Sequence, residues 1–184
     1  MSVTDEILAI LEARGAAAYF GELVSVVEHG LQAAHFARAE GASSGLVLAA
    51  LLHDIGHLLE DVPAEIEDWH TDARHEQVGG AWLARRFGPE VAEPVRLHVA
   101  AKRYLCATAP GYLAKLSPAS VQTLGLQGGP MSAAEVAAFR RERFFRDAVR
   151  VRLWDDRAKV PGLATAALPE YQELIESLSS PHAP

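Results

Sequence analysis

Cysteine is nearly absent from the chain: Cys106 is the only one among 184 residues, so no disulfide can form within it. This fits a reducing compartment, and we expect a cytoplasmic protein. Long apolar runs are missing too, because none approaches the roughly 20 residues that a membrane-spanning helix needs. Met1–Ile10 carries acidic residues and no basic segment of the kind that opens a signal peptide. We therefore expect neither secretion nor membrane association.

Basic residues are also in deficit, since 17 Lys and Arg face 24 Asp and Glu and give a net charge of −7. This balance disfavours a nucleic-acid partner. A small anionic substrate is still compatible with it, because the local charge of a site can oppose the net charge. Hydrophobic residues make up 49% of the chain, which is enough for a globular core. The length suits one domain over residues 1–184, with a frayed tail from about 179.

The alternating polar and apolar pattern of β-strands is missing, and helical periodicity runs through nearly the whole chain. Ser2 with Asp5 and Ser132 with Glu135 have the spacing of capping boxes, which begin helices. The first two expected helices end near Ala13 and Ala39, and a third begins at Ser43 or Ser44 and includes 46–60. Further helices are expected over 75–87, 89–104, 118–126 and 132–156, and a last one begins at Pro169. Pro94 should give the helix over 89–104 a kink or a late start. The acidic residues 60–71 predict a loop or lid. The expected fold class is all-α.

One stretch, Leu46–Glu60, organises the rest of the chain; it reads LVLAALLHDIGHLLE. Its first seven residues are apolar and are followed by His53, Asp54 and His57. Polar groups at the end of a buried run cost free energy unless something satisfies them. We expect these groups to bind an ion or a charged ligand, with His53 and His57 on one helix face at i, i+4 spacing.

Other candidate ligands stand in similar surroundings. His29 and His98 lie among apolar residues, His75 opens an expected helix, and Asp155 follows Trp154. A single histidine on an apolar face is more often a satisfied core residue than a ligand, but four of them with an adjacent His-Asp pair are harder to explain in that way. Imidazole and carboxylate ligands suit iron, manganese, zinc, cobalt or nickel. Four histidines and two aspartates are enough for two metal ions, and a carboxylate can bridge them.

The order His29…His53-Asp54…Asp155 resembles the H…HD…D signature of the HD-domain superfamily, an all-α metal-binding scaffold. His75 and His98 match the six-ligand pattern of its dinuclear members. The chain resembles most the mixed-valence diiron oxygenases that cleave 1-hydroxyphosphonates, the PhnZ and TmpB type, which are related to myo-inositol oxygenase. The segments that carry this likeness are YFGE (19–22), EH (28–29), LAALLHDIGH (48–57), HEQVG (75–79), HVAAKRYL (98–105), LQGGPM (126–131) and RLWD (152–155).

The resemblance implies an HD-domain helical bundle with a dinuclear metal site in its core, an Fe(II)/Fe(III) pair, and O2 as co-substrate. It implies roles for six ligands, of which Asp54 is the bridge: His29, His53, Asp54 and Asp155 for one iron, and Asp54, His75 and His98 for the other. It implies phosphonate contacts from His57, Lys102, Ser120, Thr123, Gln127 and Arg152. It also implies a gate, in which Tyr19 takes the open iron position until substrate arrives and Glu22 holds it. Without the resemblance, Lys102 and Arg152 could be surface charges and Tyr19 a core residue.

The implied reaction converts a 1-hydroxyphosphonate to a carboxylate and phosphate, and the organic group stays open. An acidic residue before the gating tyrosine would favour a primary ammonium, as in 1-hydroxy-2-aminoethylphosphonate, which gives glycine. Here that position is Ala18, and aromatic Tyr19 and Phe20 suit a trimethylammonio group, which gives glycine betaine. Hydroxymethylphosphonate, which has no organic tail, is a third candidate. Trp69 either packs or closes over substrate.

The sequence leaves two other functions open. A metal-dependent HD phosphohydrolase or phosphodiesterase would share the ligand pattern, but the cyclic-dinucleotide branch usually has lysine where His57 stands, and a GYP segment that this chain lacks. A non-catalytic sensing module is disfavoured because all six ligand types are present. We expect a small-molecule partner and a monomer or weak dimer.

Overall fold

The computed structural model describes residues 2–17, 19, 22–59 and 74–180. Within these ranges the regular elements are helices, and an isolated bridge joins Phe87 and Ser179. The prediction of an all-α fold is therefore confirmed. Among the described residues, no helix has both the length and the apolar character needed to cross a membrane. The expected loop at 60–71, including Trp69, lies outside the described residues, as do Ala18 and Phe20.

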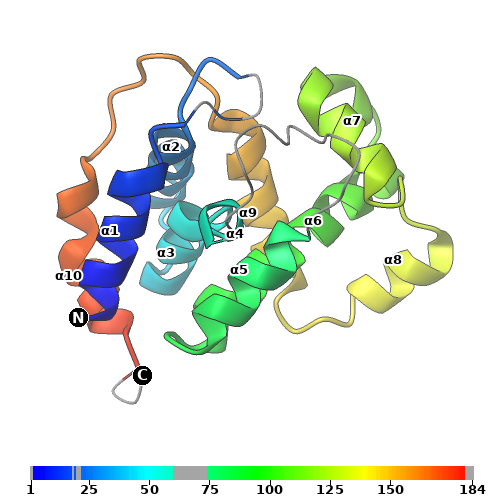
Figure 1. Ribbon diagram of the computed structural model, residues 1–184. Helices are drawn as coiled ribbons and strands as arrows, with labels where there is room; N and C mark the ends of the chain where they lie inside the picture. The colour runs from blue at the N-terminus through cyan, green and yellow to red at the C-terminus, as the bar shows by residue number, and fades with distance from the viewer. Residues whose placement is uncertain (1, 18, 20–21, 60–73, 181–184) are drawn as a thin grey trace.

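Figure 1 shows how the helices are arranged. The elements are α1 (Val3–Arg14), α2 (Val26–Ala39), α3 (Ser44–Leu52), α4 (Gly56–Leu59), α5 (His75–Ala84), α6 (Pro89–Thr108), α7 (Pro118–Leu126), α8 (Ala133–Phe139), α9 (Phe145–Arg157) and α10 (Gln172–Leu178), with short 3-10 turns at Leu113–Lys115 and Leu168–Tyr171. Helices α1 and α10 pack together at one end of the molecule, and α7 and α8 lie at the other end. Between them, α3 contacts α2, α6 and α9.

The helix ends follow the sequence signals closely. Ser2 with Asp5 and Ser132 with Glu135 form the expected capping boxes. Ser43 caps α3 by accepting a hydrogen bond from the Leu46 N–H. Helix α6 begins at Pro89 and runs through Pro94, so the late start considered for this helix is wrong. Each cap satisfies main-chain donors that helix geometry leaves unpaired.

Helix α3 is the centre of the core. Every residue from Gly45 to Leu52 is buried, which is the pattern of a helix that is apolar on all sides and surrounded by other helices. Its C-terminal end is therefore held firmly in the middle of the fold. Any side chain that follows Leu52 starts from this fixed position.

The stretch 46–60 is not one continuous helix, contrary to the sequence prediction. Helix α3 ends at Leu52, a turn covers residues 53–55, and α4 begins at Gly56. The chain passes so close to α5 here that a Cβ on Gly56 would lie 2.0 Å from the carbonyl oxygen of His75. His53 and His57 therefore do not share a helix face, and Asp54 lies in the turn between the two helices.

The long helix expected over 132–156 is divided into α8 and α9. Phe139 and Phe145 both contact the ring of Tyr104, with centroids 5.4 Å and 6.3 Å away. In an unbroken helix these two positions would point about 120° apart. The turn between α8 and α9 lets both rings pack on the same tyrosine, which explains the break.

Candidate metal centre

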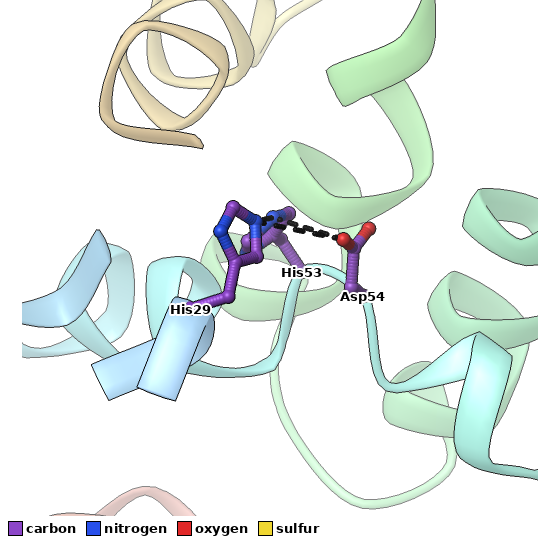
Figure 2. A group of neighbouring side chains, drawn as sticks. All are labelled: His29, His53 and Asp54. Carbon is purple, nitrogen blue, oxygen red and sulfur yellow. Dashed lines mark hydrogen bonds and ion pairs between the residues drawn. The ribbon is translucent and has the colours of Figure 1, made fainter. Parts of the chain in front are cut away.

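Three residues from two neighbouring helices begin the site. His29 lies in α2, His53 is the C-cap of α3, and Asp54 follows it in the turn. Figure 2 shows the two rings and the carboxylate converging on one point. The His29 and His53 Nε2 atoms are 3.0 Å apart, and the Asp54 Oδ2 lies 3.4 Å from His53 Nε2 and 3.7 Å from His29 Nε2. Asp155 from α9 completes this group, with its Oδ1 3.3 Å from His29 Nε2.

A second group forms on the other oxygen of Asp54. His75 is the first residue of α5, and His98 lies in the middle of α6. Their Nε2 atoms are 3.3 Å apart and lie 3.3 Å and 3.5 Å from the Asp54 Oδ1. His29, His53 and Asp54 lie close enough together to hold a metal ion, and so do Asp54, His75 and His98. Because its two oxygens face different groups, Asp54 has the geometry of a bridging carboxylate. We call the six residues together the metal centre: His29, His53, Asp54, His75, His98 and Asp155.

Main-chain carbonyls orient three of the four rings. The Nδ1 atoms of His29, His53 and His98 lie 2.8, 2.8 and 2.7 Å from the carbonyl oxygens of Ala158, Ala50 and Val95. A ring that donates from Nδ1 presents the lone pair of Nε2, which is the arrangement of a metal-binding histidine.

The fourth ring has a different neighbour. The Nδ1 of His75 lies 3.8 Å from the Glu76 Oε2, which is buried and has no hydrogen-bond partner in the described part of the chain. A carboxylate behind a ligand ring is a common partner in metal sites. Sequence reasoning missed Glu76, although it directly follows a candidate ligand.

Charges in the metal centre favour cation binding. Burial raises the pKa of Asp54, but the nearby His53, His75 and His98 outweigh it and hold that pKa well below its usual value. Burial likewise opposes ionisation of Asp155, and the Arg152 guanidinium with His29 and His53 keeps its pKa well below normal. For His53, burial is outweighed by Asp54 and then Asp155, which raise its pKa to about 9. Four imidazoles and two ionised carboxylates fit a pair of first-row transition-metal ions.

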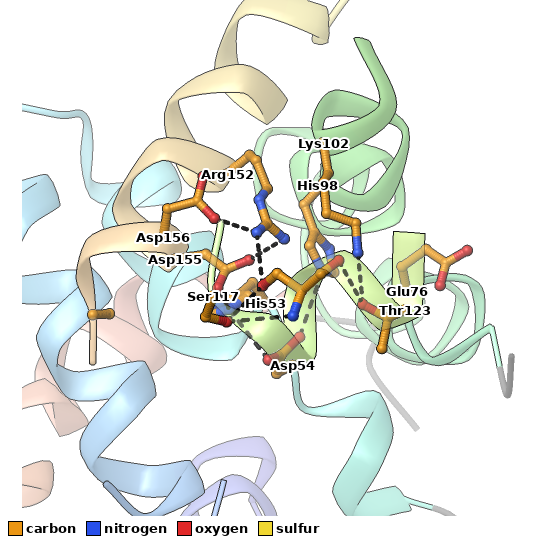
Figure 3. A network of polar contacts seen from close by, with 12 residues as sticks. His53, Asp54, Glu76, His98, Lys102, Ser117, Thr123, Arg152, Asp155 and Asp156 are labelled. Carbon is orange, nitrogen blue, oxygen red and sulfur yellow. Dashed lines mark hydrogen bonds and ion pairs between the residues drawn. The ribbon is translucent and has the colours of Figure 1, made fainter. Parts of the chain in front are cut away.

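A cluster of cations and hydroxyls lies beside the metal centre, as Figure 3 shows. Arg152 of α9 is buried and forms an ion pair with the ligand Asp155 at 2.8 Å. Its guanidinium also contacts Asp156, donates to the Tyr112 hydroxyl at 3.1 Å and lies 3.5 Å from the Ser120 Oγ. Arg152 therefore connects the candidate ligand Asp155 with α7.

Lys102 reaches α7 from the opposite side. Its Nζ donates to the Thr123 Oγ1 at 2.9 Å, and its side chain is buried. Burial, helped by the charge of Arg152, lowers the pKa of Lys102 to about 8. Lys159, which sequence reasoning missed, lies 3.2 Å from the Ser117 Oγ and 3.3 Å from the Ser120 Oγ. We call the cluster of Lys102, Ser117, Ser120, Thr123 and Arg152 the anion site, and Lys159 lies next to it.

Two other residues expected to contact the phosphonate, His57 and Gln127, are not part of the anion site. His57 stacks on the ligand ring of His75, with centroids 3.8 Å apart, and burial holds its pKa well below the usual value. Gln127 ends α7 and lines a cavity of about 200 Å³ with Glu76 and Arg103. Its Oε1 is buried and has no hydrogen-bond partner among the residues that the structure describes. The structure thus brings Ser120 and Thr123 to the cations, and places Gln127 in a cavity next to Glu76.

Tyr19 reaches directly into the metal centre. Its hydroxyl donates to the Asp54 Oδ2 at 2.7 Å, and its ring stacks on His29 with centroids 3.9 Å apart. Burial and then the charges of Asp54 and Asp155 raise its pKa well above normal, so the phenol is neutral. The Glu22 N–H donates to the Tyr19 carbonyl at 2.7 Å, while the Glu22 carboxylate lies 3.3 Å from Lys159 Nζ.

Comparison with known proteins agrees with this arrangement. The HD domain model matches residues 26–137. The chain belongs to the HD-domain family. It is similar to a hydroxymethylphosphonate dioxygenase of Gimesia maris, at 47% identity over 86% of this chain and 80% of the relative. It is also similar to a [1-hydroxy-2-(trimethylamino)ethyl]phosphonate dioxygenase (glycine-betaine-forming) of Leisingera caerulea, at 37% identity over 98% of this chain and 92% of the relative.

These relatives place the chain among the dioxygenases of the HD-domain family, so it is an enzyme and an oxidoreductase. The family model ends before α9, yet α9 supplies Asp155 and Arg152. The expected likeness to hydroxyphosphonate oxygenases is confirmed at the level of the family and of its reaction class.

Proposed function

We propose that this protein is a diiron oxygenase that cleaves the carbon–phosphorus bond of a 1-hydroxyphosphonate. One O2 is consumed, and the products are a carboxylate and phosphate; this balances all atoms without a further reductant. The observation that carries the proposal is the position of Arg152, which pairs with the ligand Asp155 at 2.8 Å and lies 3.5 Å from the Ser120 hydroxyl of the anion site. An anion held there lies beside the metal centre.

Two iron ions would supply a Lewis-acidic anchor for the substrate oxygens and the redox capacity that O2 chemistry needs. His29, His53, Asp54 and Asp155 would hold one of them, and Asp54, His75 and His98 the other. The ion identity is inferred from the donor set and from the dioxygenase names of the relatives.

The residues of the anion site bind and orient the phosphonate. Arg152 and Lys102 supply positive charge, and Ser120 and Thr123 supply hydroxyl donors. His57 is kept neutral by burial and adds a donor on the His75 side. A substrate fixed at its phosphonate end and at its hydroxyl presents the C1 hydrogen in one direction, which replaces a search among orientations.

Tyr19 and Glu22 would act as a gate. The Tyr19 hydroxyl occupies one face of Asp54 and its ring covers His29, so it shields the metal centre until substrate takes its place. Such shielding limits unproductive reaction with O2 and keeps water out.

The substrate candidates differ only in the organic group. The relative with 47% identity is named for hydroxymethylphosphonate, and the one with 37% identity for the trimethylamino compound. We therefore place hydroxymethylphosphonate first, followed by the trimethylammonio and 2-amino compounds.

The test is anaerobic loading with iron, followed by O2 and each of the three phosphonates in turn. Phosphate together with formate, glycine betaine or glycine identifies the substrate. Hydrolysis of phosphate esters with manganese or magnesium, and no reaction of any hydroxyphosphonate with O2, would replace this proposal with that of a phosphohydrolase.

A further inference from the structure

Lys159 stands between the proposed gate and the anion site. It follows the end of α9, and its side chain is 13% exposed. Its Nζ lies 3.2 Å from the Ser117 Oγ, 3.3 Å from the Ser120 Oγ and 3.3 Å from the Glu22 Oε1. One ammonium group thus contacts two hydroxyls of the anion site and one carboxylate of the gate.

The hydroxyls that Lys159 contacts also face other groups of the anion site. Ser120 lies 3.5 Å from Arg152, and Ser117 caps the N-terminus of α7. An anion accepting hydrogen bonds from Ser120 would therefore come within reach of both Arg152 and Lys159. Two cations around one hydroxyl form a stronger anion site than either cation alone.

The pairing of Lys159 with Glu22 is loose. Among the described residues, Glu22 is the only carboxylate at ion-pair distance from Lys159, and its Oε1 makes no hydrogen bond of acceptable geometry there. The Glu22 main chain is tied to Tyr19 through the N–H bond to the Tyr19 carbonyl. The Lys159 Nζ also lies 5.8 Å from the centre of the Tyr19 ring.

We propose that Lys159 is a further phosphonate-binding residue, for which Glu22 and the substrate compete. A doubly ionised phosphonate attracts the ammonium more strongly than one carboxylate at similar distance. When Lys159 moves to the phosphonate, Glu22 loses its cation and the contacts that surround Tyr19 change. The inference rests on the proposed function, because it takes the phosphonate as the anion.

The experiment measures binding of hydroxymethylphosphonate to the iron-loaded protein without O2, by isothermal titration calorimetry. Lys159→Met should raise the dissociation constant about tenfold, the usual effect of losing one charged hydrogen bond. Lys159→Arg should restore most of the affinity. Lys115→Met removes the same charge from an exposed position next to α7, and we expect a change of less than about twofold.

If Glu22 and the phosphonate compete for Lys159, removing the charge of Glu22 should change the affinity in the opposite direction. Glu22→Gln should tighten binding about fivefold, because it frees Lys159 for the phosphonate. In the Lys159→Met background the same Glu22→Gln change should have no effect. A gain that persists in that background would show that Glu22 acts through its general field and would overturn the proposal.

Binding without O2 separates this inference from the proposed reaction. If hydroxymethylphosphonate binds and the Lys159 and Glu22 effects are absent, the inference fails while the oxygenase proposal stands. If these effects are present but O2 releases no phosphate, Lys159 is an anion-binding residue and the proposed reaction fails. A parallel titration with inorganic phosphate should show the same order of variants.

Discussion

Main-chain atoms orient most histidines of the metal centre, whereas side chains hold the cations of the anion site. His29, His53 and His98 each bond a carbonyl oxygen of a helix or helix end. Lys102 of the anion site and the neighbouring Lys159 instead contact hydroxyls of α7. A helix backbone cannot move without disrupting the core, but a side-chain contact can be exchanged for a contact to a ligand. The metal centre should therefore keep its geometry when substrate binds, and the anion site should rearrange.

The largest effect should come from the residue that both metal groups share. Asp54→Ala removes one ligand oxygen from each group, so we expect metal content to fall from two ions per chain to nearly none. Inductively coupled plasma mass spectrometry measures this. Asp156→Ala is the matched control, because it removes a nearby aspartate that contacts Arg152 and is not one of the six residues of the metal centre. Retention of two ions by Asp54→Ala would refute the bridge.

The next effect concerns the anion site and its pH dependence. In the proposed function Lys102 binds the phosphonate only when it is charged, and its pKa is lowered to about 8. Above that pH the free enzyme loses the positive charge, so kcat/KM should fall about tenfold per pH unit, and below it the value should be level with respect to this group. The Lys102→Arg variant keeps its positive charge across this pH range, so its kcat/KM should not fall above about pH 8. An identical fall of kcat/KM in the Lys102→Arg variant would show that another group titrates there.

A smaller effect should distinguish the two halves of the metal centre. Glu76 faces the Nδ1 of His75, so Glu76→Gln should weaken binding of the ion that Asp54, His75 and His98 would hold about tenfold and leave binding of the other ion unchanged. Competition with a chelator measures both affinities. Glu90→Gln is the control, because it makes the same change at a glutamate in the first turn of α6. Equal weakening of both ions would contradict a specific role for Glu76.

The smallest expected change is at the gate. Tyr19→Phe removes the hydrogen bond to Asp54 and should lower the free energy of unfolding by about 1 kcal/mol. Iron should stay bound, while the visible spectrum without substrate should change. Tyr112→Phe removes a hydroxyl that contacts Asp156 and Arg152, and it should leave that spectrum as it is. An unchanged spectrum in Tyr19→Phe would count against the gate.

Local signals made much of the fold predictable. Capping residues such as Ser2 and Ser132 act within one helical turn, so the sequence alone identifies the helix starts. The break after Leu52 was missed because its cause is the close approach of Gly56 to His75, which is a contact between helices. The turn between α8 and α9 likewise depends on Tyr104, which lies far away in the sequence.

The clustering of the candidate metal ligands was predictable because their residue types are unusual in apolar surroundings. His29, His53, Asp54, His98 and Asp155 are all buried, and no ordinary core needs so many polar groups. Lys159 and Tyr112 carry no such signal, since a lysine after a helix and a tyrosine in a turn are common on protein surfaces. Only the folded chain places them next to Ser120 and Arg152. The single-domain organisation and the oligomeric state stay predictions.

The most direct test of the oxygenase proposal is the ratio of O2 consumed to phosphate released by the iron-loaded protein with hydroxymethylphosphonate. An oxygen electrode and a phosphate assay on the same sample give both quantities. The proposed reaction predicts one O2 per phosphate and no phosphate under anaerobic conditions. Phosphate released without O2 would contradict an oxidative cleavage at this metal centre.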